Sequence, residues 1–171
     1  MSQVILIDEN NKEIGFEDKL VAHRLGKLHR AFSIFIFNDK NEILIQKRAI
    51  DKYHSSGLWS NACCSHPLPY LALENEIHSR LIYENGFDCD LKELFSFKYK
   101  CKFPNNLFEN ELDFVYIGKY NGNIILNKEE ASDYKWVSFD KLQIEILKTP
   151  KLFTYWFKLI LKDYSHLLKF P

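Results

Sequence analysis

Runs of apolar residues separated by polar turns dominate the first half of the chain. Ala31–Phe37 and Glu42–Gln46 are rich in aliphatic and aromatic residues and are joined by the polar turn Asn38-Asp39-Lys40-Asn41. This is the pattern of two strands connected by a turn. A loop through Ser55-Ser56-Gly57 then leads into another extended stretch at Leu58–Cys63. These segments predict a sheet near the centre of the fold.

One later segment follows helical spacing instead. Leu73, Ile77 and Leu81 recur every four residues, which places them on one face of a helix over Leu73–Asn85. Gly86 follows directly, in the position where a glycine ends many helices. We therefore expect this helix to pack on the core through its three apolar side chains.

The remaining elements complete a mixed architecture. We expect a hairpin at Val4–Asp8 and Lys12–Ile14, followed by a brief helix at Phe16–Val21. Further strands are expected at Leu94–Lys100, Leu112–Lys119 and Tyr134–Val137. Two closing helices are expected at Asp140–Leu147 and Lys151–Leu168. Strands mixed with a few helices predict an α/β (α+β) fold in which a mixed sheet is layered with helices. The sequence has no internal repeat or Pro/Gly-rich linker, so residues 1–171 are expected to form a single domain.

Composition and charge narrow the class of protein. Of 171 residues, 46% are hydrophobic and 15% are aromatic, enough for one filled core with aromatic rings left to line a pocket. Basic and acidic residues both number 23, so no basic field attracts nucleic acid or a membrane surface. The N-terminal residues lack the pattern of a secretory signal, and the apolar runs are too short to cross a bilayer. We expect a cytoplasmic protein.

The four cysteines do not suggest a disulfide framework or a zinc ribbon. Cys63 and Cys64 are adjacent, and Cys89 and Cys101 stand apart without a Cys-x-x-Cys pair. For Cys89 and Cys101, buried or unreactive thiols are the simpler interpretation. The adjacent pair precedes Ser65-His66-Pro67, where a cysteine two residues before a histidine can place a thiol beside a metal. Two small buried residues before a turn proline are the alternative.

A second group of residues has the composition of a metal site. Glu109 and Glu111 flank one asparagine, and on an extended segment both carboxylates face the same way. With His23, His29 and His66 they form a nitrogen and oxygen set that suits Mn²⁺, Mg²⁺ or Zn²⁺. Each residue alone has an ordinary explanation, either as a hydrogen-bonded histidine or as a carboxylate on a solvated strand face. Spacing by itself therefore does not decide whether these residues bind a metal.

The helix over Leu73–Asn85 also carries charged residues at helical spacing. Glu76, Arg80 and Glu84 lie four residues apart, beside its apolar face. The run from Arg80 to Gly86 is similar to the second half of the Nudix signature R-E-x-x-E-E-x-G, in which helix carboxylates hold Mg²⁺ on a diphosphate. A surface Arg–Glu pair is the ordinary alternative. Diphosphate binding also needs cations that converge from several elements. The candidates are Lys19, Arg48, Lys52 and Arg80.

Taken together, these motifs resemble the type I isopentenyl diphosphate isomerases, a branch of the Nudix fold. The family's cysteine motif, G-x-W followed by T-N-x-x-C-x-H-P, is matched at positions 57–67 with serine in place of threonine. Its other matching elements are Glu109-Asn110-Glu111, His29-Arg30-Ala31-Phe32, Arg48-Ala49-Ile50-Asp51-Lys52, Tyr99, Asp133-Tyr134-Lys135-Trp136 and Trp156. The motifs occur in family order from about Val4 to Trp156, after a short N-terminal extension.

The resemblance implies a role for each candidate residue. Cys64, which holds the C-x-H spacing, would be the catalytic thiol, with Glu111 as its acid–base counterpart and Tyr99 in support. Trp156 would lay its ring over the hydrocarbon end of the substrate. The implied ligands of the first metal are His23, His29, His66, Glu109 and Glu111, with Glu84 binding Mg²⁺ on the diphosphate. The implied diphosphate contacts are Lys19, Arg48, Lys52 and Arg80.

The implied activity is the interconversion of isopentenyl diphosphate and dimethylallyl diphosphate by a 1,3-proton shift. The implied cofactors are Mg²⁺, which arrives with the diphosphate, and a second divalent ion, Mn²⁺, Mg²⁺ or Zn²⁺, at the His/Glu site. The implied partner is a small prenyl diphosphate, with no nucleic acid and no membrane, and the protein would be a monomer or a weak homodimer.

The sequence departs from the family pattern around the helix signature. Tyr70-Leu71 stand where Gly-Glu is expected, Glu76 stands where a small residue is usual, and Asn85 replaces a common leucine. A Nudix-type diphosphate hydrolase is the main alternative, but it needs several helix carboxylates, and of the signature only Glu84 remains. A binding module without catalysis gives no reason for the cysteine and E-N-E motifs to be intact.

Overall fold

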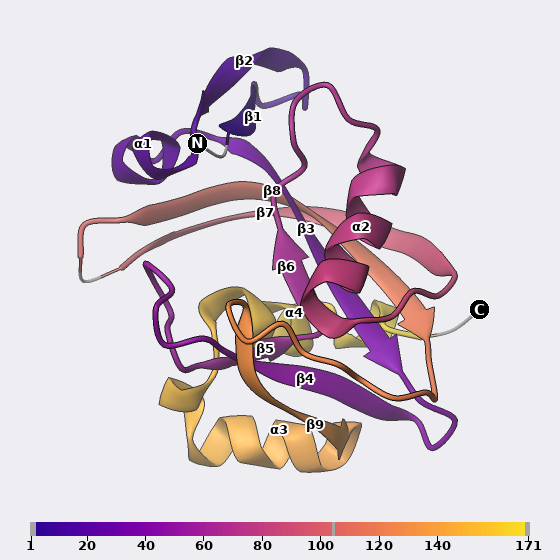
Figure 1. Cartoon of the computed structure of the whole chain (residues 1–171). Helices are drawn as coiled ribbons and strands as arrows, with labels where there is room; N and C mark the ends of the chain where they lie inside the picture. Colours follow the sequence, from indigo (N-terminus) through magenta and orange to yellow (C-terminus); the bar gives the residue numbers. More distant parts are fainter. Residues whose placement is uncertain (1–2, 104, 170–171) are drawn as a thin grey trace.

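The chain folds around a mixed β-sheet (Figure 1). The computed structural model describes residues 3–103 and 105–169, and nine strands within these ranges join one sheet. The strands are β1 (Gln3–Ile7), β2 (Glu13–Asp18), β3 (His29–Phe37), β4 (Glu42–Arg48), β5 (Trp59–Asn61), β6 (Cys63–Ser65), β7 (Leu91–Lys102), β8 (Phe108–Lys119) and β9 (Ala131–Ser138). The helices are α1 (Lys19–Leu25), α2 (Leu73–Asn85), α3 (Phe139–Lys148) and α4 (Tyr155–Asp163), with 3₁₀ turns at Pro150–Leu152 and Ser165–Leu167. The expected α+β architecture is confirmed.

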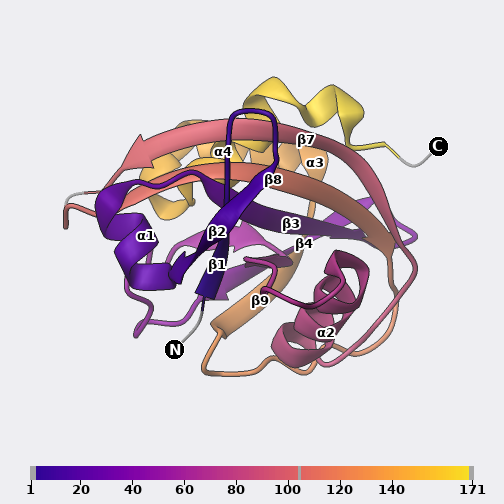
Figure 2. The same cartoon turned by 90° about the horizontal axis from the view of Figure 1, so that it is seen from above.

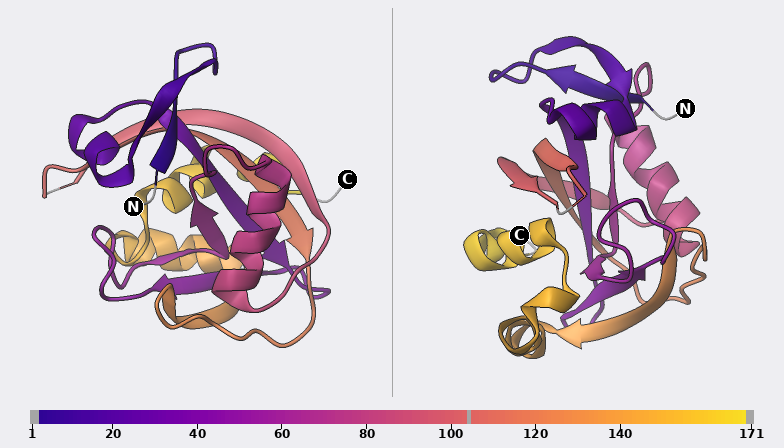
Figure 3. Two further views of the ribbon diagram at one scale, coloured as in Figure 1. Left: turned by 45° about the horizontal axis from the view of Figure 1, so that its top comes forward. Right: turned by 90° about the vertical axis from the view of Figure 1, so that its left-hand side faces the viewer.

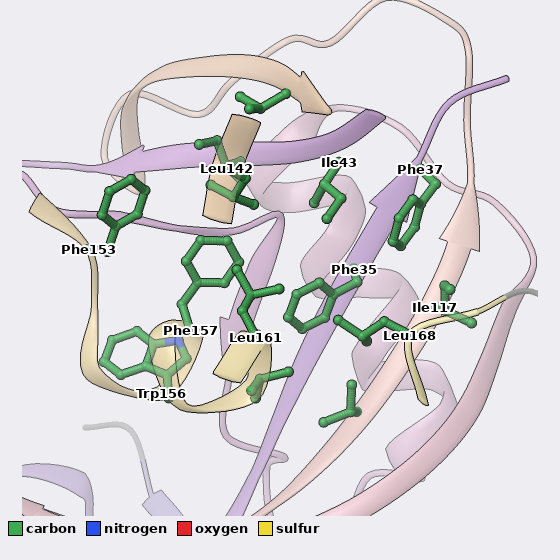
Figure 4. Close-up of a cluster of buried hydrophobic side chains, with 14 of the residues drawn as sticks. Phe35, Phe37, Ile43, Ile117, Leu142, Phe153, Trp156, Phe157, Leu161 and Leu168 are labelled. Carbon is green, nitrogen blue, oxygen red and sulfur yellow. The ribbon is translucent and has the colours of Figure 1, made fainter. Parts of the chain in front are cut away.

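β3 is the central strand of the sheet. It pairs in parallel with β8 and antiparallel with β1, β4 and β6. Its side chains alternate between two cores: Phe32 and Ile34 pack beneath α2, whereas Phe35 and Phe37 face α4 (Figure 4). Because both faces are covered, this strand is apolar almost throughout and does not alternate between apolar and polar positions.

Helices cover both faces of the sheet, as Figures 2 and 3 show. On one face lies α2, where Ile77 and Leu81 are buried and Leu73 is partly buried, as their spacing predicted. On the other face lies α4, whose Phe157 and Ile160 belong to the larger core. Within residues 3–103 and 105–169, none of the helices is long and apolar enough to cross a membrane.

The N-terminal hairpin and α1 pack across one end of β3 (Figure 1). The helix expected at Phe16–Val21 is wrong in its first half, because Phe16 lies in β2 and the helix begins only at Lys19. The reason is a helix cap: the Asp18 carboxylate accepts hydrogen bonds from two backbone N–H groups of the first turn, at 3.0 and 3.1 Å.

The single closing helix expected over Lys151–Leu168 is also wrong, since α4 is flanked by two separate 3₁₀ turns. Phe153 is extended and forms a bridge with Trp59 of β5. The Thr154 N–H donates to the Trp59 carbonyl at 3.0 Å, so the chain pairs with the sheet before the helix starts. This pairing fixes the start of α4 and therefore the position of Trp156.

The stretch expected at Leu58–Cys63 forms two strands instead of one. Of these, β5 pairs with β4 and β6 pairs with β3, so the chain changes neighbours at Ala62. Within β6, Cys63 packs beneath α2 while Cys64 packs against the α4 core, because successive side chains of a strand point to opposite faces. The two adjacent thiols therefore have different surroundings.

Gly86 ends α2 at a point with no space for a side chain. Its φ is +74°, and a Cβ atom there would lie 2.8 Å from both Cβ and the carbonyl oxygen of Ile125. We expect Gly86→Ala to lower the free energy of unfolding by about 2–5 kcal/mol, from a left-handed backbone cost of about 1–2 kcal/mol and an overpacking cost of about 1–3 kcal/mol. Urea denaturation measures this change.

Gly57→Ala is the matched control. Gly57 has a similar φ of +69°, but the nearest atom to its added Cβ would be Ile50 Cδ1 at 3.8 Å. Only the backbone cost applies there, so we expect a loss of about 1–2 kcal/mol. Equal losses in the two variants would contradict the packing argument at Gly86.

Candidate active site

A small buried cavity of about 40 Å³ lies on the α4 side of the sheet. Side chains from β3, β6, β7, β8, α1 and α4 line it, together with the loop that follows β4. All four residues expected to be catalytic, Cys64, Tyr99, Glu111 and Trp156, contribute to its wall. The fold therefore brings together groups that are far apart in the sequence.

Three of the expected metal ligands converge on a fourth, Glu111. The Nε2 atoms of His23, His29 and His66 lie 3.9, 3.4 and 2.8 Å from Glu111 Oε1. The parallel pairing of β3 with β8 places His29 directly opposite Glu111, while α1 supplies His23 and the end of β6 leads to His66. The candidate ligand atoms of these four residues all lie within 4.8 Å of one another.

His23 and His29 share a hydrogen-bond pattern that directs a lone pair into this cluster. The Nδ1 atom of each lies beside a backbone carbonyl to which it can donate, that of Lys19 at 2.7 Å and that of Lys27 at 2.8 Å. Each Nε2 is then an acceptor, and among the described residues nothing donates to either atom. Metal-binding histidines are commonly held in this way. The residues present fit a divalent metal ion.

The protonation states also suit a metal site. Burial lowers the pKa of His23 to about 4 and holds the pKa of His66 well below its usual range. Burial acts to raise the pKa of Glu111, but the neighbouring imidazoles of His29 and His66 outweigh it and hold that pKa well below the usual value. Neutral imidazoles and an ionised carboxylate are the forms that bind metals.

Glu109 lies beside this cluster and shares Tyr99 with Glu111. The phenol oxygen is 2.6 Å from Glu111 Oε2 and 2.8 Å from Glu109 Oε2. A phenol has one proton to donate. Burial and the negative charge of Glu111 raise the pKa of Glu109 well above its usual value. Without a bound metal ion, a protonated Glu109 donating to Tyr99, which in turn donates to Glu111, satisfies all three groups, and metal binding would release that proton.

His54 belongs to the site, and sequence reasoning missed it. Its side chain is buried, and its Nε2 lies 3.3 Å from Glu109 Oε1. With His23 and Glu109 it forms a second set of candidate ligand atoms, also within 4.8 Å of one another. The signal available in the sequence was its place two residues after Lys52 of the R-A-x-x-K element.

Cys64 is held at the cavity wall by two hydrogen bonds. The Trp156 Nε1–H donates to Cys64 Sγ at 3.0 Å, and the Cys64 thiol donates to Asn61 Oδ1 at 2.8 Å. Burial, followed by the charge of Asp113, raises the pKa of Cys64 to about 12, so the group is a neutral thiol at neutral pH. Cys63, on the other face of the sheet, is fully buried beneath α2.

Two of the four candidate cations, Lys19 and Arg48, line the cavity. Within the described ranges neither has a carboxylate at ion-pair distance, and Arg48 Nε is buried without a hydrogen-bond partner. The Arg48 guanidinium lies 5.4 Å from the centre of the Trp156 ring. Burial, and then the charges of Arg48, Lys52 and Arg80, lower the pKa of Lys19 to about 8. All four cations therefore influence one region, which favours an anionic ligand.

Lys52 and Arg80 take part in an ion-pair network outside the cavity lining. Arg80 Nη2 donates to Glu84 Oε1 at 2.6 Å and lies 3.2 Å from Glu130 Oε1, which belongs to the carboxylate that also pairs with Lys52. Gln46 Nε2 donates to the other oxygen of Glu84 at 2.9 Å. Each Glu84 oxygen thus has one hydrogen-bond partner, and an ion binding there has to share the carboxylate with Arg80 and Gln46.

Comparisons with known proteins agree with the fold and the motifs. Residues 27–157 match the family model of the NUDIX domain. The chain is 46% identical to a protein of Aromatoleum aromaticum named isopentenyl-diphosphate Delta-isomerase 2, over 90% of this chain and 82% of the relative. It is 48% identical to a protein of the same name from Photorhabdus laumondii, over 95% and 92%.

Solved structures show the same fold at low sequence identity. A protein of Deinococcus radiodurans has a TM-score of 0.78 and 15% identity, with 95% of this chain and 99% of that chain covered. A MutT protein of Methanosarcina mazei has a TM-score of 0.67 and 17% identity, with 84% and 96% covered. These similarities support the fold alone.

The histidine cluster generates a test of metal binding. We expect the protein loaded with Mn²⁺ to retain about one ion per chain after gel filtration, because neutral imidazoles and carboxylates converge there. His66→Ala removes one donor and should weaken binding at least about 10–100-fold. Elemental analysis of the filtered protein measures the difference.

His166→Ala is the control, since His166 is exposed near the C-terminal end and lies outside the cluster. It should retain the ion as the unaltered protein does. Full occupancy in His66→Ala at the same free metal concentration would show that His66 is not a ligand.

Proposed function

The chain belongs to the NUDIX family and, within it, to the isopentenyl-diphosphate Delta-isomerases, and on that basis we propose how its cavity interconverts isopentenyl diphosphate and dimethylallyl diphosphate. The reaction adds a proton to the terminal alkene carbon and removes another from the carbon two positions along, through a tertiary carbocation-like state. Cys64 and Glu111 are the acid and base of this shift. The observation that carries the proposal is that this thiol and this carboxylate line the same cavity as the unpaired cations Lys19 and Arg48.

Glu111 exchanges its proton within a connected set of groups. Tyr99 holds one of its oxygens at 2.6 Å and contacts Glu109 at 2.8 Å, so a proton gained by one carboxylate changes the hydrogen bond to the other. A divalent ion in the His/Glu cluster supplies positive charge that lowers the proton affinity of Glu111. Tyr99 is the group that keeps the carboxylate in one orientation during the transfer.

Cys64 is the second proton-transfer group. Asn61 and Trp156 hold its sulfur in place through hydrogen bonds of 2.8 and 3.0 Å, and its direction along β6 turns it toward the cavity. Cys63 points to the opposite face, into the core beneath α2, and takes no part in the reaction. The register of the C-x-H-P motif and the alternation of side chains along β6 therefore both support Cys64 as the proton-transfer group.

Trp156 forms the aromatic wall beside the hydrocarbon end of the substrate. A cation over a desolvated indole ring is stabilised by about 2 kcal/mol. Arg48 already lies over this ring, so the ring is open to positive charge. When the diphosphate draws the guanidinium toward itself, the indole face becomes available to the carbocation-like state.

The diphosphate binds to Lys19 and Arg48, which have no carboxylate partner within residues 3–103 and 105–169, and to Lys52 and Arg80, which exchange part of their ion pairs for phosphate oxygens. Glu84 then binds Mg²⁺ carried by the diphosphate. The metal at the His/Glu cluster is Mn²⁺, Mg²⁺ or Zn²⁺, and the cluster offers both nitrogen and oxygen ligands.

Hydrolysis of a diphosphate is less well supported by α2. A hydrolase needs several helix carboxylates to activate water, but of the carboxylates on α2 only Glu84 matches the signature. Glu76 is buried beside the core, and burial raises its pKa.

We further propose that residues 1–171 act as one domain, in the cytoplasm, as a monomer or a weak homodimer.

We expect Cys64→Ala to abolish the isomerisation, by a factor of at least about 10³, because it removes a proton-transfer group. Cys63→Ala should keep most of the activity at a modest cost in stability. Proton NMR of isopentenyl diphosphate with enzyme and Mg²⁺ follows the appearance of dimethylallyl diphosphate.

The two cysteines are neighbours with opposite faces, so each variant is the control for the other. Equal loss in two folded variants would show that the wrong thiol is assigned. Release of inorganic phosphate without dimethylallyl diphosphate would instead favour the hydrolase.

Trp156 is tested by the pattern of kinetic constants. Trp156→Phe keeps a weaker π face, and Trp156→Leu keeps bulk without a quadrupole. We expect kcat to fall in the order Trp, Phe, Leu while KM changes little, because the ring acts on the transition state. Binding of an ammonium analogue of the carbocation should weaken in the same order.

Trp156 is also part of the core beside Phe153 and Phe157 (Figure 4), so packing has to be separated from catalysis. Thermal unfolding of each variant supplies that separation. A large drop in stability with unchanged ammonium affinity in the folded protein would mean that the ring acts through packing alone.

A further inference from the structure

His54 repeats, on the Glu109 side of the cavity, the arrangement found at His23 and His29. Its Nδ1 lies 3.2 Å from Ser55 Oγ, and its Nε2 lies 3.3 Å from Glu109 Oε1. When Nδ1–H donates a hydrogen bond to the serine hydroxyl, the lone pair of Nε2 faces a carboxylate oxygen. The imidazoles of the main cluster approach Glu111 in the same way.

The ring of His54 is held firmly in this direction. It stacks on Phe103 with the ring centres 4.7 Å apart and an angle of 11°, and it meets the edge of Tyr53 at 4.4 Å. The His54 carbonyl accepts a hydrogen bond from Arg48 Nη2 at 3.4 Å. The side chain is only 7% exposed. A buried imidazole whose ring and backbone both have fixed neighbours is suited to a site that needs a constant geometry.

The two sets of candidate ligand atoms have His23 in common. The His23 Nδ1 is taken up by the Lys19 carbonyl, so Nε2 is its available ligand atom and can bind one ion. Donors at right angles around an ion, each about 2.1 Å from it, lie about 3 Å apart. The Nε2–oxygen distances of 3.3 Å at His54 and 2.8–3.9 Å at Glu111 are of that size. The six residues do not form one set within 4.8 Å, so a single ion near His23 draws on both sets by bringing them closer together.

We propose that His54 is a sixth protein ligand of this ion, beside His23, His29, His66, Glu109 and Glu111. Four imidazoles and two carboxylate oxygens then complete an octahedron, and the ion carries no water before substrate binds. So nitrogen-rich a site favours a transition ion such as Mn²⁺, Co²⁺ or Zn²⁺ over Mg²⁺, which prefers oxygen ligands. This inference rests on the metal site of the proposed function and adds a ligand to it.

X-ray absorption spectroscopy of the full chain, loaded with Mn²⁺ and free of substrate, counts the imidazoles. We expect four in the unaltered protein. In His54→Phe we expect three, with a water oxygen in the vacated position and metal affinity about 10–100-fold weaker. Phenylalanine keeps the stacking on Phe103 and removes the donor atom. Water-proton relaxation by bound Mn²⁺ should rise in this variant, because one exchanging water enters the inner shell.

His78→Phe is the matched control, because His78 is on α2, where it pairs with Asp88 outside the cavity. His78→Phe should leave both the X-ray absorption spectrum and the water-proton relaxation unchanged. Three imidazoles in the unaltered protein would overturn the role of His54 without any variant and leave the five-ligand site intact. No bound ion in the unaltered protein would overturn that site as well.

Discussion

Lone pairs of several imidazoles point toward carboxylate oxygens in a buried space of this protein. The Nε2 atoms of His23 and His29 have no donor among the described residues, and both face Glu111. Electron-rich groups that face one another without water are unfavourable unless a proton or a metal ion lies among them. The hydrogen bonds from the two Nδ1 atoms to backbone carbonyls prevent either ring from turning away. The fold thus maintains an arrangement that a cation stabilises.

The pairing of β3 with β8 is what makes this arrangement possible. It is parallel and regular over its length, and it puts His29 opposite Glu111. Because side chains alternate along β8, Glu109, Glu111 and Asp113 all face the α4 side, where burial raises the pKa of the first and the last. Three acids at alternate positions of one strand would repel one another if all were ionised. Sharing of protons through Tyr99 and the nearby imidazoles removes much of that cost.

Local pattern was enough to predict the helix at Leu73–Asn85 and the extended segment at Glu109–Glu111. Those features depend on residues close together in the sequence. The break before α4 was not predictable in this way, because it arises from pairing between Thr154 and Trp59. The position of His54 next to Glu109 was missed for the same reason. Contacts across such distances in sequence depend on the complete sheet, and no periodicity records them.

The reaction brings a diphosphate anion and a transient carbocation into one small molecule, and each needs different surroundings. In the proposed mechanism the anion is met by Lys19 and Arg48, which line the cavity and form no ion pair with any described residue. At the hydrocarbon end a thiolate or a free water molecule would trap the cation, whereas an indole ring stabilises it without forming a bond. The raised pKa of Cys64 keeps sulfur in its less nucleophilic thiol form, and the cavity of about 40 Å³ leaves room for few water molecules. In the proposed mechanism, the hydrogen bond from Trp156 to Cys64 joins these two functions, because the side chain that holds the thiol also presents the π face. A change that shifts α4 would therefore disturb proton transfer and cation stabilisation together.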